Sequence, residues 1–152
     1  MTRPIREGFH SLTPHLIVRG AAEAIDYYKK AFGAEERGRM ASPDGKAIWH
    51  AELRIGDSVL MLNDEFPDMG AVSPLTNGGS GVTLHLYVPD ADAVFERAVQ
   101  AGGKVKMPLA DQFWGDRYGV IVDPFGHKWA IATHKEDPTE EQIRERVSKM
   151  TR

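Results

Sequence analysis

Two histidines occupy matching positions in two similar stretches of the chain. The first stretch reads TPHLIVRGAAEAI from Thr13 and the second reads TLHLYVPDADAVF from Thr83, so His15 and His85 are each third in their stretch. A single histidine in an apolar strand is usually a packed core residue. Two histidines at equivalent points of a repeated unit indicate another role, a site formed where the two copies face each other.

One carboxylate is placed to join these histidines. In the segment HAELRI, the apolar Ala51, Leu53 and Ile55 alternate with His50 and Glu52. Successive side chains of a strand point to opposite faces, so His50 and Glu52 are expected to face a cleft. Glu52 is the candidate general base, because burial in an apolar cleft raises the pKa of a carboxyl group.

Nucleophilic catalysis has no comparable support. The chain has no cysteine, and none of its serines lies in a G-x-S-x-G elbow. The lack of cysteine also excludes disulfides and thiolate metal sites, and it fits a cytoplasmic protein.

Aromatic side chains favour the binding of a flat organic molecule. They lie near expected strand ends and in the loop QFWGDRYG, which also contains Tyr118. Aromatic faces bind planar molecules through stacking and apolar burial. The pair Phe113-Trp114 either contacts the ligand or plugs the end of the fold, and Arg117 either orients a polar ligand group or pairs with Asp116. The predicted ligand-binding residues are His15, Trp49, His85, Tyr87, Phe113, Trp114 and Arg117.

Two similar units are expected to position these residues. Each reads as strand, helix and three strands, with the weakest strand signals near 35–40 and 104–108. The first helix, AAEAIDYYKKAFG, carries an apolar face and ends at Gly33, while Gly56-Asp57 and the segment DPFG (123–126) mark hairpin turns. Two unrelated units of similar length are the alternative to a duplication. Residues identical at an offset of seventy include Thr13/Thr83, His15/His85, Leu16/Leu86, Val18/Val88, Ala31/Ala101 and Gly33/Gly103.

The sequence predicts a single domain over residues 1–152. Module 1 covers about 12–64, a Gly- and Pro-rich linker 65–82, and module 2 about 83–135. The GGSG segment of the linker is interpreted as a flexible connection rather than a phosphate cradle. A C-terminal helix is expected over 139–150, where Thr139 and Gln142 form a capping box.

Composition excludes several classes of function. The net charge is −3 and there is no long basic run, so nucleic-acid binding has little support. No apolar run is long enough for a membrane helix, and the first residues lack the apolar core of a signal peptide.

The chain resembles the vicinal-oxygen-chelate superfamily, which includes glyoxalases, bleomycin-resistance proteins and extradiol dioxygenases. The resemblance covers residues 12–135 and rests on the paired units, on IDYYKKAFGAE and, most specifically, on DPFGHKWAIAT. The run DQFWGDRYGVIVDPFGHKWAIATH looks most like the PhnB-like and glyoxalase-like branch. The resemblance implies an α+β fold, in which two tandem βαβββ modules form a curved eight-stranded sheet around a cleft. It also implies a homodimer.

Metal-dependent members of this superfamily place their ligands on the first and last strands of each module. Carried over, these positions fall on Thr13, Thr83, Leu60 and Ala130, which are poor ligands or none. The sequence therefore predicts a protein that binds a small organic molecule in its cleft without the usual metal. The alternative is a lyase, isomerase or dioxygenase with a divalent metal at a displaced site, formed by His15, His85 and Glu52.

Overall fold

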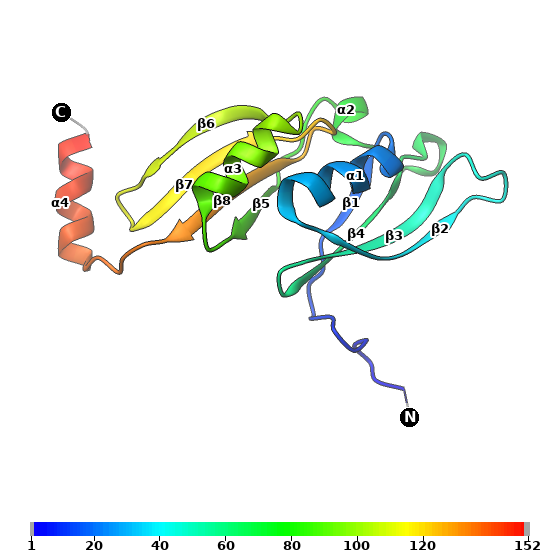
Figure 1. Ribbon diagram of the computed structural model, residues 1–152, viewed down its shortest axis with the longest axis horizontal. Helices are drawn as coiled ribbons and strands as arrows, with labels where there is room; N and C mark the ends of the chain where they lie inside the picture. The colour runs from blue at the N-terminus through cyan, green and yellow to red at the C-terminus, as the bar shows by residue number, and fades with distance from the viewer. Residues whose placement is uncertain (1, 151–152) are drawn as a thin grey trace.

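The computed structural model describes residues 2–150 as two consecutive βαβββ modules followed by a helix (Figure 1). Module 1 contains β1 (His15–Val18), α1 (Ala21–Phe32), β2 (Glu35–Ala41), β3 (Ile48–Ile55) and β4 (Ser58–Asp64). Module 2 contains β5 (Thr83–Tyr87), α3 (Ala91–Gln100), β6 (Lys104–Asp111), β7 (Asp116–Val122) and β8 (Lys128–His134).

Each module forms its own four-stranded mixed sheet. The strand orders are β1-β4-β3-β2 and β5-β8-β7-β6, and in both sheets the first strand pairs in parallel with the last. The two sheets lie side by side, with α1 and α3 on the same side of the molecule (Figure 1). The predicted fold class is confirmed, with the eight strands divided between two hydrogen-bonded sheets.

The segment between the modules contains two short helical turns. These are the 3-10 turn η1 (Pro67–Met69) and the one-turn helix α2 (Pro74–Asn77). Glu65 accepts hydrogen bonds from the amide of Ser73 (3.1 Å) and the hydroxyl of Thr76 (2.7 Å). The first part of the linker is thus held to module 1, and the glycine-rich part follows α2.

The helices form where their apolar residues recur at helical spacing. The buried face of α1 includes Ala24, Ile25, Tyr28 and Phe32, as the sequence predicts. The helix ends at Gly33, whose φ of 68° is a left-handed conformation that glycine adopts without steric cost. In module 2, the carboxylate of Asp90 caps α3 by accepting the amide of Ala93 (3.1 Å).

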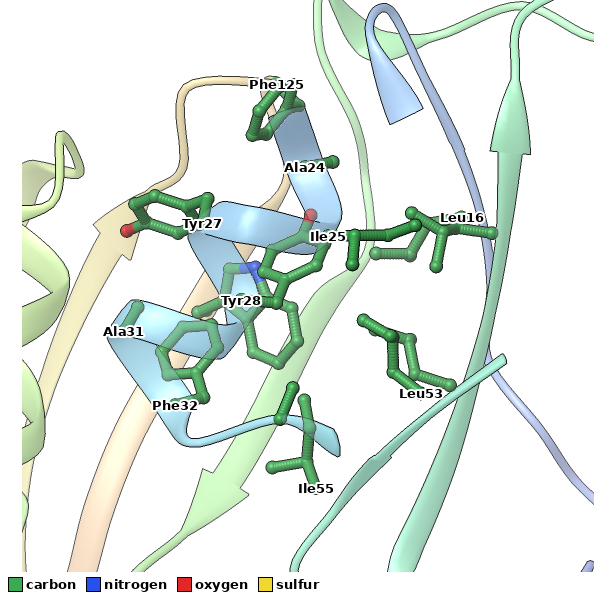
Figure 2. Packing of buried hydrophobic residues seen from close by; sticks show 14 of the residues in the cluster. Leu16, Ala24, Ile25, Tyr27, Tyr28, Ala31, Phe32, Leu53, Ile55 and Phe125 are labelled. Carbon is green, nitrogen blue, oxygen red and sulfur yellow. The ribbon is translucent and has the colours of Figure 1, made fainter. Parts of the chain in front are cut away.

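The core lies between the helices and the sheets and spans both modules. Figure 2 shows Tyr28 and Phe32 of α1 among buried side chains that include Leu53 of β3, while Phe125 of the β7–β8 loop lies near the other end of α1. Trp129 of β8 is only 3% exposed, and its ring lies 4.4 Å from that of Phe32. Trp129 therefore faces the helices and belongs to the core.

A buried carboxylate also joins the two modules. Asp123, in the β7–β8 turn of module 2, accepts hydrogen bonds from the hydroxyl of Tyr28 in module 1 (2.6 Å) and from the indole N–H of Trp129 (2.9 Å). It also accepts the amides of Phe125 and His127, at 2.9 Å each. All four donors satisfy a charge that would otherwise be costly to bury.

The helix α4 (Glu140–Met150) stands at the far end of the second sheet (Figure 1). Its capping box is confirmed, because Thr139 and Gln142 exchange side chain–backbone hydrogen bonds of 2.9 and 3.1 Å. No residue of α4 is buried, and Arg146 ties the helix to the rest of the chain through Glu136 (2.6 Å) and the carbonyl of Phe113 (3.1 Å). Across residues 2–150, no helix combines the length and apolar character needed to cross a membrane.

Candidate functional site

Each sheet has one face that points away from its helix, here called the open face. Ala51, Leu53 and Ile55 are buried on the helix side of β3, so His50 and Glu52 lie on the open face, as predicted. In module 2, the register places His85 beside Ala130 and Tyr87 beside Ala132 on the open face.

The strand register corrects one expected equivalence between the modules. His15 pairs with Met61 and His85 pairs with Ala130, so Met61, and not Leu60, is the counterpart of Ala130. Leu60 belongs to the core and is 4% exposed. The offset of seventy therefore shortens by one residue in the last strand.

The open face of module 2 carries a continuous group of rings, here called the aromatic wall: His85, Tyr87, Phe113, Trp114 and Tyr118. The ring of His85 lies 4.6 Å from Tyr87 and 5.6 Å from Tyr118. Trp114 lies 5.1 Å from Tyr118 and 5.0 Å from Phe113, in edge-to-face arrangements. Four of these five residues were predicted to bind ligand, and the structure brings them together from β5, β7 and the loop before β7.

The aromatic wall covers small residues but leaves ring surface exposed. Ala130 and Ala132, which the sequence places on the cleft side, are both 0% exposed, and Ala132 pairs with Tyr87 on one side and Tyr118 on the other. Tyr87 is 60% exposed. A flat molecule can therefore stack on the exposed ring surface without displacing a strand of the sheet.

Asp116 holds the aromatic wall in position. Its side chain is 2% exposed and accepts hydrogen bonds from the indole N–H of Trp114 (3.0 Å) and the hydroxyl of Tyr87 (3.1 Å). Its other oxygen accepts from Nδ1 of His134 (2.7 Å). Burial opposes ionisation, but the hydrogen bonds from His134, Trp114 and Tyr87 outweigh it and hold the pKa of Asp116 below its ordinary value.

His134 connects Asp116 to the segment that leads to α4. Its Nε2 donates to Asp137 (2.7 Å) while Nδ1 donates to Asp116. An imidazole that donates from both nitrogens carries the extra proton. Accordingly, the hydrogen bonds to Asp116 and then to Asp137 raise the pKa of His134 above its ordinary value.

Arg117 does not belong to the aromatic wall. Its guanidinium pairs with Asp92 of α3 (3.0 Å) and with Asp111 (3.5 Å), on the helix side of the sheet. The expected pair between Asp116 and Arg117 is therefore wrong, because adjacent strand residues point to opposite faces. The prediction that Arg117 orients a ligand is not supported by this placement.

Trp49 also lies apart from the aromatic wall, on β3 of module 1. The β2–β3 register shifts between Met40, opposite His50, and Ala41, opposite Ile48, so Trp49 lies at a bulge. It is 47% exposed. The sequence placed Trp49 near the end of a strand, and this position alone does not say which other side chains it lies beside.

The open face of module 1 carries a polar group instead of a ring surface. Nε2 of His15 donates to the side-chain oxygen of Asn63, and Nε2 of His50 donates to Glu52 (2.9 Å). The rings of His15 and His50 meet edge to face at 5.8 Å. Arg6 reaches the same carboxylate from the N-terminal segment, at 2.9 and 3.3 Å.

The environment of Glu52 differs from the one expected for a general base. Hydrogen bonds from Arg6 and then His50 hold the pKa of Glu52 below its ordinary value of 4.5, whereas burial alone would raise it. The carboxylate is therefore charged near neutral pH, and its basicity is reduced. The expected raised pKa is wrong because Arg6, far away in sequence, supplies a cation.

The residues implied by the family resemblance do not fit a metal ion. Leu60 and Ala130 carry no donor atom, Met61, which the register places at the position of Ala130, offers only a soft thioether, and threonine, at positions 13 and 83, is a poor ligand. Within residues 2–150, no three or more acidic or histidine side chains form a group that could hold a metal. The displaced set of His15, His85 and Glu52 is thus not brought together, and Nε2 of His15 is already bonded to Asn63.

Two cavities flank the junction between β1 and β5. One has a volume of about 460 Å³ and is lined mainly by apolar residues such as Phe9, Val59 and Leu84, together with His85. The other has a volume of about 450 Å³, and its lining includes His15 and His127. The two predicted histidines therefore line different cavities rather than one shared cleft.

Sequence reasoning missed the residues that act through tertiary contacts. Asp116 was considered only as a partner of Arg117, and Asn63 and Arg6 were not considered. Asp116 is the one with a local signal, because it lies two residues from both Trp114 and Tyr118. Arg6 carried none, since its partner is 46 residues away.

The fold described above is shared with a known superfamily of proteins. The chain belongs to the Glyoxalase/Bleomycin resistance protein/Dioxygenase superfamily, which it matches over residues 8–131. It is 49% identical over 141 residues to an uncharacterized protein of Mycobacterium bovis, covering 91% of this chain and 92% of that one. It is 32% identical over 152 residues to the protein YjdN of Escherichia coli, covering 85% and 99%.

Solved structures share the fold. An Arabidopsis thaliana protein is 31% identical with a TM-score of 0.65, over 82% of this chain and 98% of that chain. TioX from Micromonospora is 26% identical with a TM-score of 0.64, over the same shares. A PhnB protein from Bacillus cereus, described as a putative 3-demethylubiquinone-9 3-methyltransferase, shares the fold at 19% identity and a TM-score of 0.63, over 82% of this chain and 99% of that chain.

Proposed function

We propose that this protein binds a small planar aromatic molecule on the aromatic wall of module 2. The observation that carries the proposal is the unbroken series of ring contacts from His85 to Phe113, with ring surface exposed at Tyr87. Rings fixed by packing and by Asp116 lose little conformational freedom when a ligand stacks on them.

The neighbouring cavity supports the same proposal. Its volume of about 460 Å³ lies in the range of small-molecule pockets, and its lining is mainly apolar. His85 lines this cavity and also contacts Tyr87 and Tyr118 of the wall. One ligand can therefore place a planar group on the wall and an apolar group in the cavity.

Recognition in this proposal rests on side chains and requires no metal, since the donor set at the family's ligand positions does not fit one. The proposal includes the cytoplasmic location and the homodimer expected from the sequence. Its family supports small-molecule binding in general terms, because the superfamily includes bleomycin resistance proteins.

Titration with 1-naphthol, followed by tryptophan fluorescence, tests the proposal. Trp114→Ala removes one ring of the wall and is expected to weaken binding by about 1–2 kcal/mol, roughly 5- to 30-fold in Kd. Trp49→Ala is the matched control, because it removes an exposed tryptophan from the other module. Equal affinity in wild type and Trp114→Ala, or a loss confined to Trp49→Ala, would count against the wall as the binding surface.

A further inference from the structure

The N-terminal segment 2–12 leads away from the two sheets and has little apolar packing of its own (Figure 1). Leu12 is 89% exposed and Ile5 is 49% exposed. Arg6 makes its ionic attachment: its two terminal nitrogens donate to the two oxygens of Glu52, at 2.9 and 3.3 Å. The guanidinium also lies over the ring of Phe9, 4.4 Å from its centroid.

The receiving carboxylate is more enclosed than the arginine that reaches it. The Glu52 side chain is 16% exposed and that of Arg6 is 66% exposed. One oxygen of Glu52 is also fixed by Nε2 of His50, whose ring is in turn braced against His15. Glu52 therefore presents both oxygens in a set orientation, whereas Arg6 enters from the solvent side.

We propose that Glu52 and His50 form a binding subsite for a planar cation, namely an amidinium or guanidinium attached to an aromatic ring. Arg6 and Phe9 of the chain's own N-terminal segment, here called the stand-in, occupy this subsite in place of the ligand. The paired contacts of Arg6 match the two parallel N–H groups that such a cation offers to a carboxylate. The ring of Phe9 lies face-on against this guanidinium, so the subsite has room for an aromatic ring next to the cation.

The stand-in can be displaced because it is held mainly by the ion pair between Arg6 and Glu52. Ion pairs between exposed side chains contribute little to stability, and Arg6 is mostly exposed. Hydrogen bonds from Arg6 and His50 keep the pKa of Glu52 low, and 4.5 is its ordinary value, so the carboxylate stays charged at pH 7 when Arg6 leaves. The subsite lies on module 1 and includes no ring of the aromatic wall, although Phe9 also lines the cavity of about 460 Å³ that His85 borders. The proposal does not rest on the function proposed for module 2.

Competition by the segment predicts how affinity changes when Arg6 is removed. An occupied subsite binds a ligand with an apparent Kd raised by the inverse of its free fraction. If Arg6 occupies Glu52 in roughly nine of ten molecules, Arg6→Ala improves the apparent Kd for a planar cation about tenfold.

Benzamidine is the probe, and benzamide is its neutral counterpart of the same shape. Binding to the full chain is measured by calorimetry or by amide chemical shifts. We expect Arg6→Ala to bind benzamidine several-fold more tightly than wild type, Glu52→Gln to lose this binding, and benzamide, which lacks the charge, to bind wild type and Arg6→Ala equally. Equal benzamidine affinity in wild type and Arg6→Ala, or retained binding in Glu52→Gln, overturns the proposal.

Two controls separate this result from other effects. Arg3→Ala removes the same charge from the same segment and is expected to leave the benzamidine Kd unchanged; a gain equal to that of Arg6→Ala overturns the stand-in role. Trp114→Ala is expected to bind benzamidine as wild type does. The binding proposed for module 2 is therefore tested by Trp114→Ala, and the subsite proposed for module 1 is tested by Arg6→Ala and Glu52→Gln. Dependence of benzamidine binding on Trp114 overturns the assignment to Glu52.

Discussion

Replacement of Asp123 by alanine tests the contact that links the two modules. Asp123 is 4% exposed and accepts the hydroxyl of Tyr28 from module 1 together with the indole N–H of Trp129. It also accepts the amides of Phe125 and His127 in its own turn. Alanine at this position removes the acceptor for all four donors at once.

The magnitude follows from the burial of the donors. Tyr28 is 0% exposed and Trp129 is 3% exposed, so water cannot readily replace the lost acceptor. A buried donor without a partner costs about 1–3 kcal/mol, which makes the two side chains together worth roughly 2–6 kcal/mol. The amides of Phe125 and His127 lose the same acceptor, and the hydrogen bond of His127 is only partly buried. We expect Asp123→Ala to lower the free energy of unfolding by roughly 3–5 kcal/mol.

Urea unfolding followed by circular dichroism measures this loss. Tyr28→Phe removes one donor to a charged acceptor and is expected to cost roughly 1.5–3 kcal/mol. Asp57→Ala, in an exposed hairpin turn, is the control and is expected to change the free energy of unfolding by less than about 0.5 kcal/mol. A loss below about 1 kcal/mol in Asp123→Ala, with an unchanged denaturant slope, would refute the reasoning from burial and hydrogen bonding.

Two further predictions concern pH and metal. The pKa of His134 is raised in the folded protein above the ordinary value of 6.5, so its contribution to stability is fully present below about pH 6.5 and is lost as pH rises through the folded value. Urea midpoints between about pH 5.5 and 8.5 should therefore fall more in wild type than in His134→Gln, and parallel profiles would contradict this account. Untagged protein is expected to hold no stoichiometric Ni, Zn, Mn or Fe and to bind 1-naphthol equally after chelation; one equivalent of metal that disappears in His15→Ala would instead establish the displaced-site alternative.

Local signals in the sequence determined the elements of the fold. The helical spacing of apolar residues and Gly33 set the extent of α1, and Gly56-Asp57 and the segment 123–126 set the two hairpin turns. Alternation along β8 was enough to place Trp129 in the core. These features depend on backbone geometry and on neighbours within a few residues, which a single sequence contains.

The tertiary structure decided which residues share a site. His15 and His85 stand at matching positions of the repeat, yet they line different cavities, although each cavity is bordered by residues of both modules. Register decided that Met61 lies opposite His15, and strand alternation turned Arg117 toward α3.

The sequence by itself thus determined two repeated βαβββ modules, the buried face of α1, and four of the five members of the aromatic wall. Only the tertiary structure decided that Asp116 fixes that wall, that Asp123 joins the modules, and that Arg6 occupies Glu52. The physical reason is the distance along the chain between the residues that interact. Hydrophobic periodicity is written within one element, whereas a hydrogen bond or ion pair between distant segments exists only once packing has brought the two partners together.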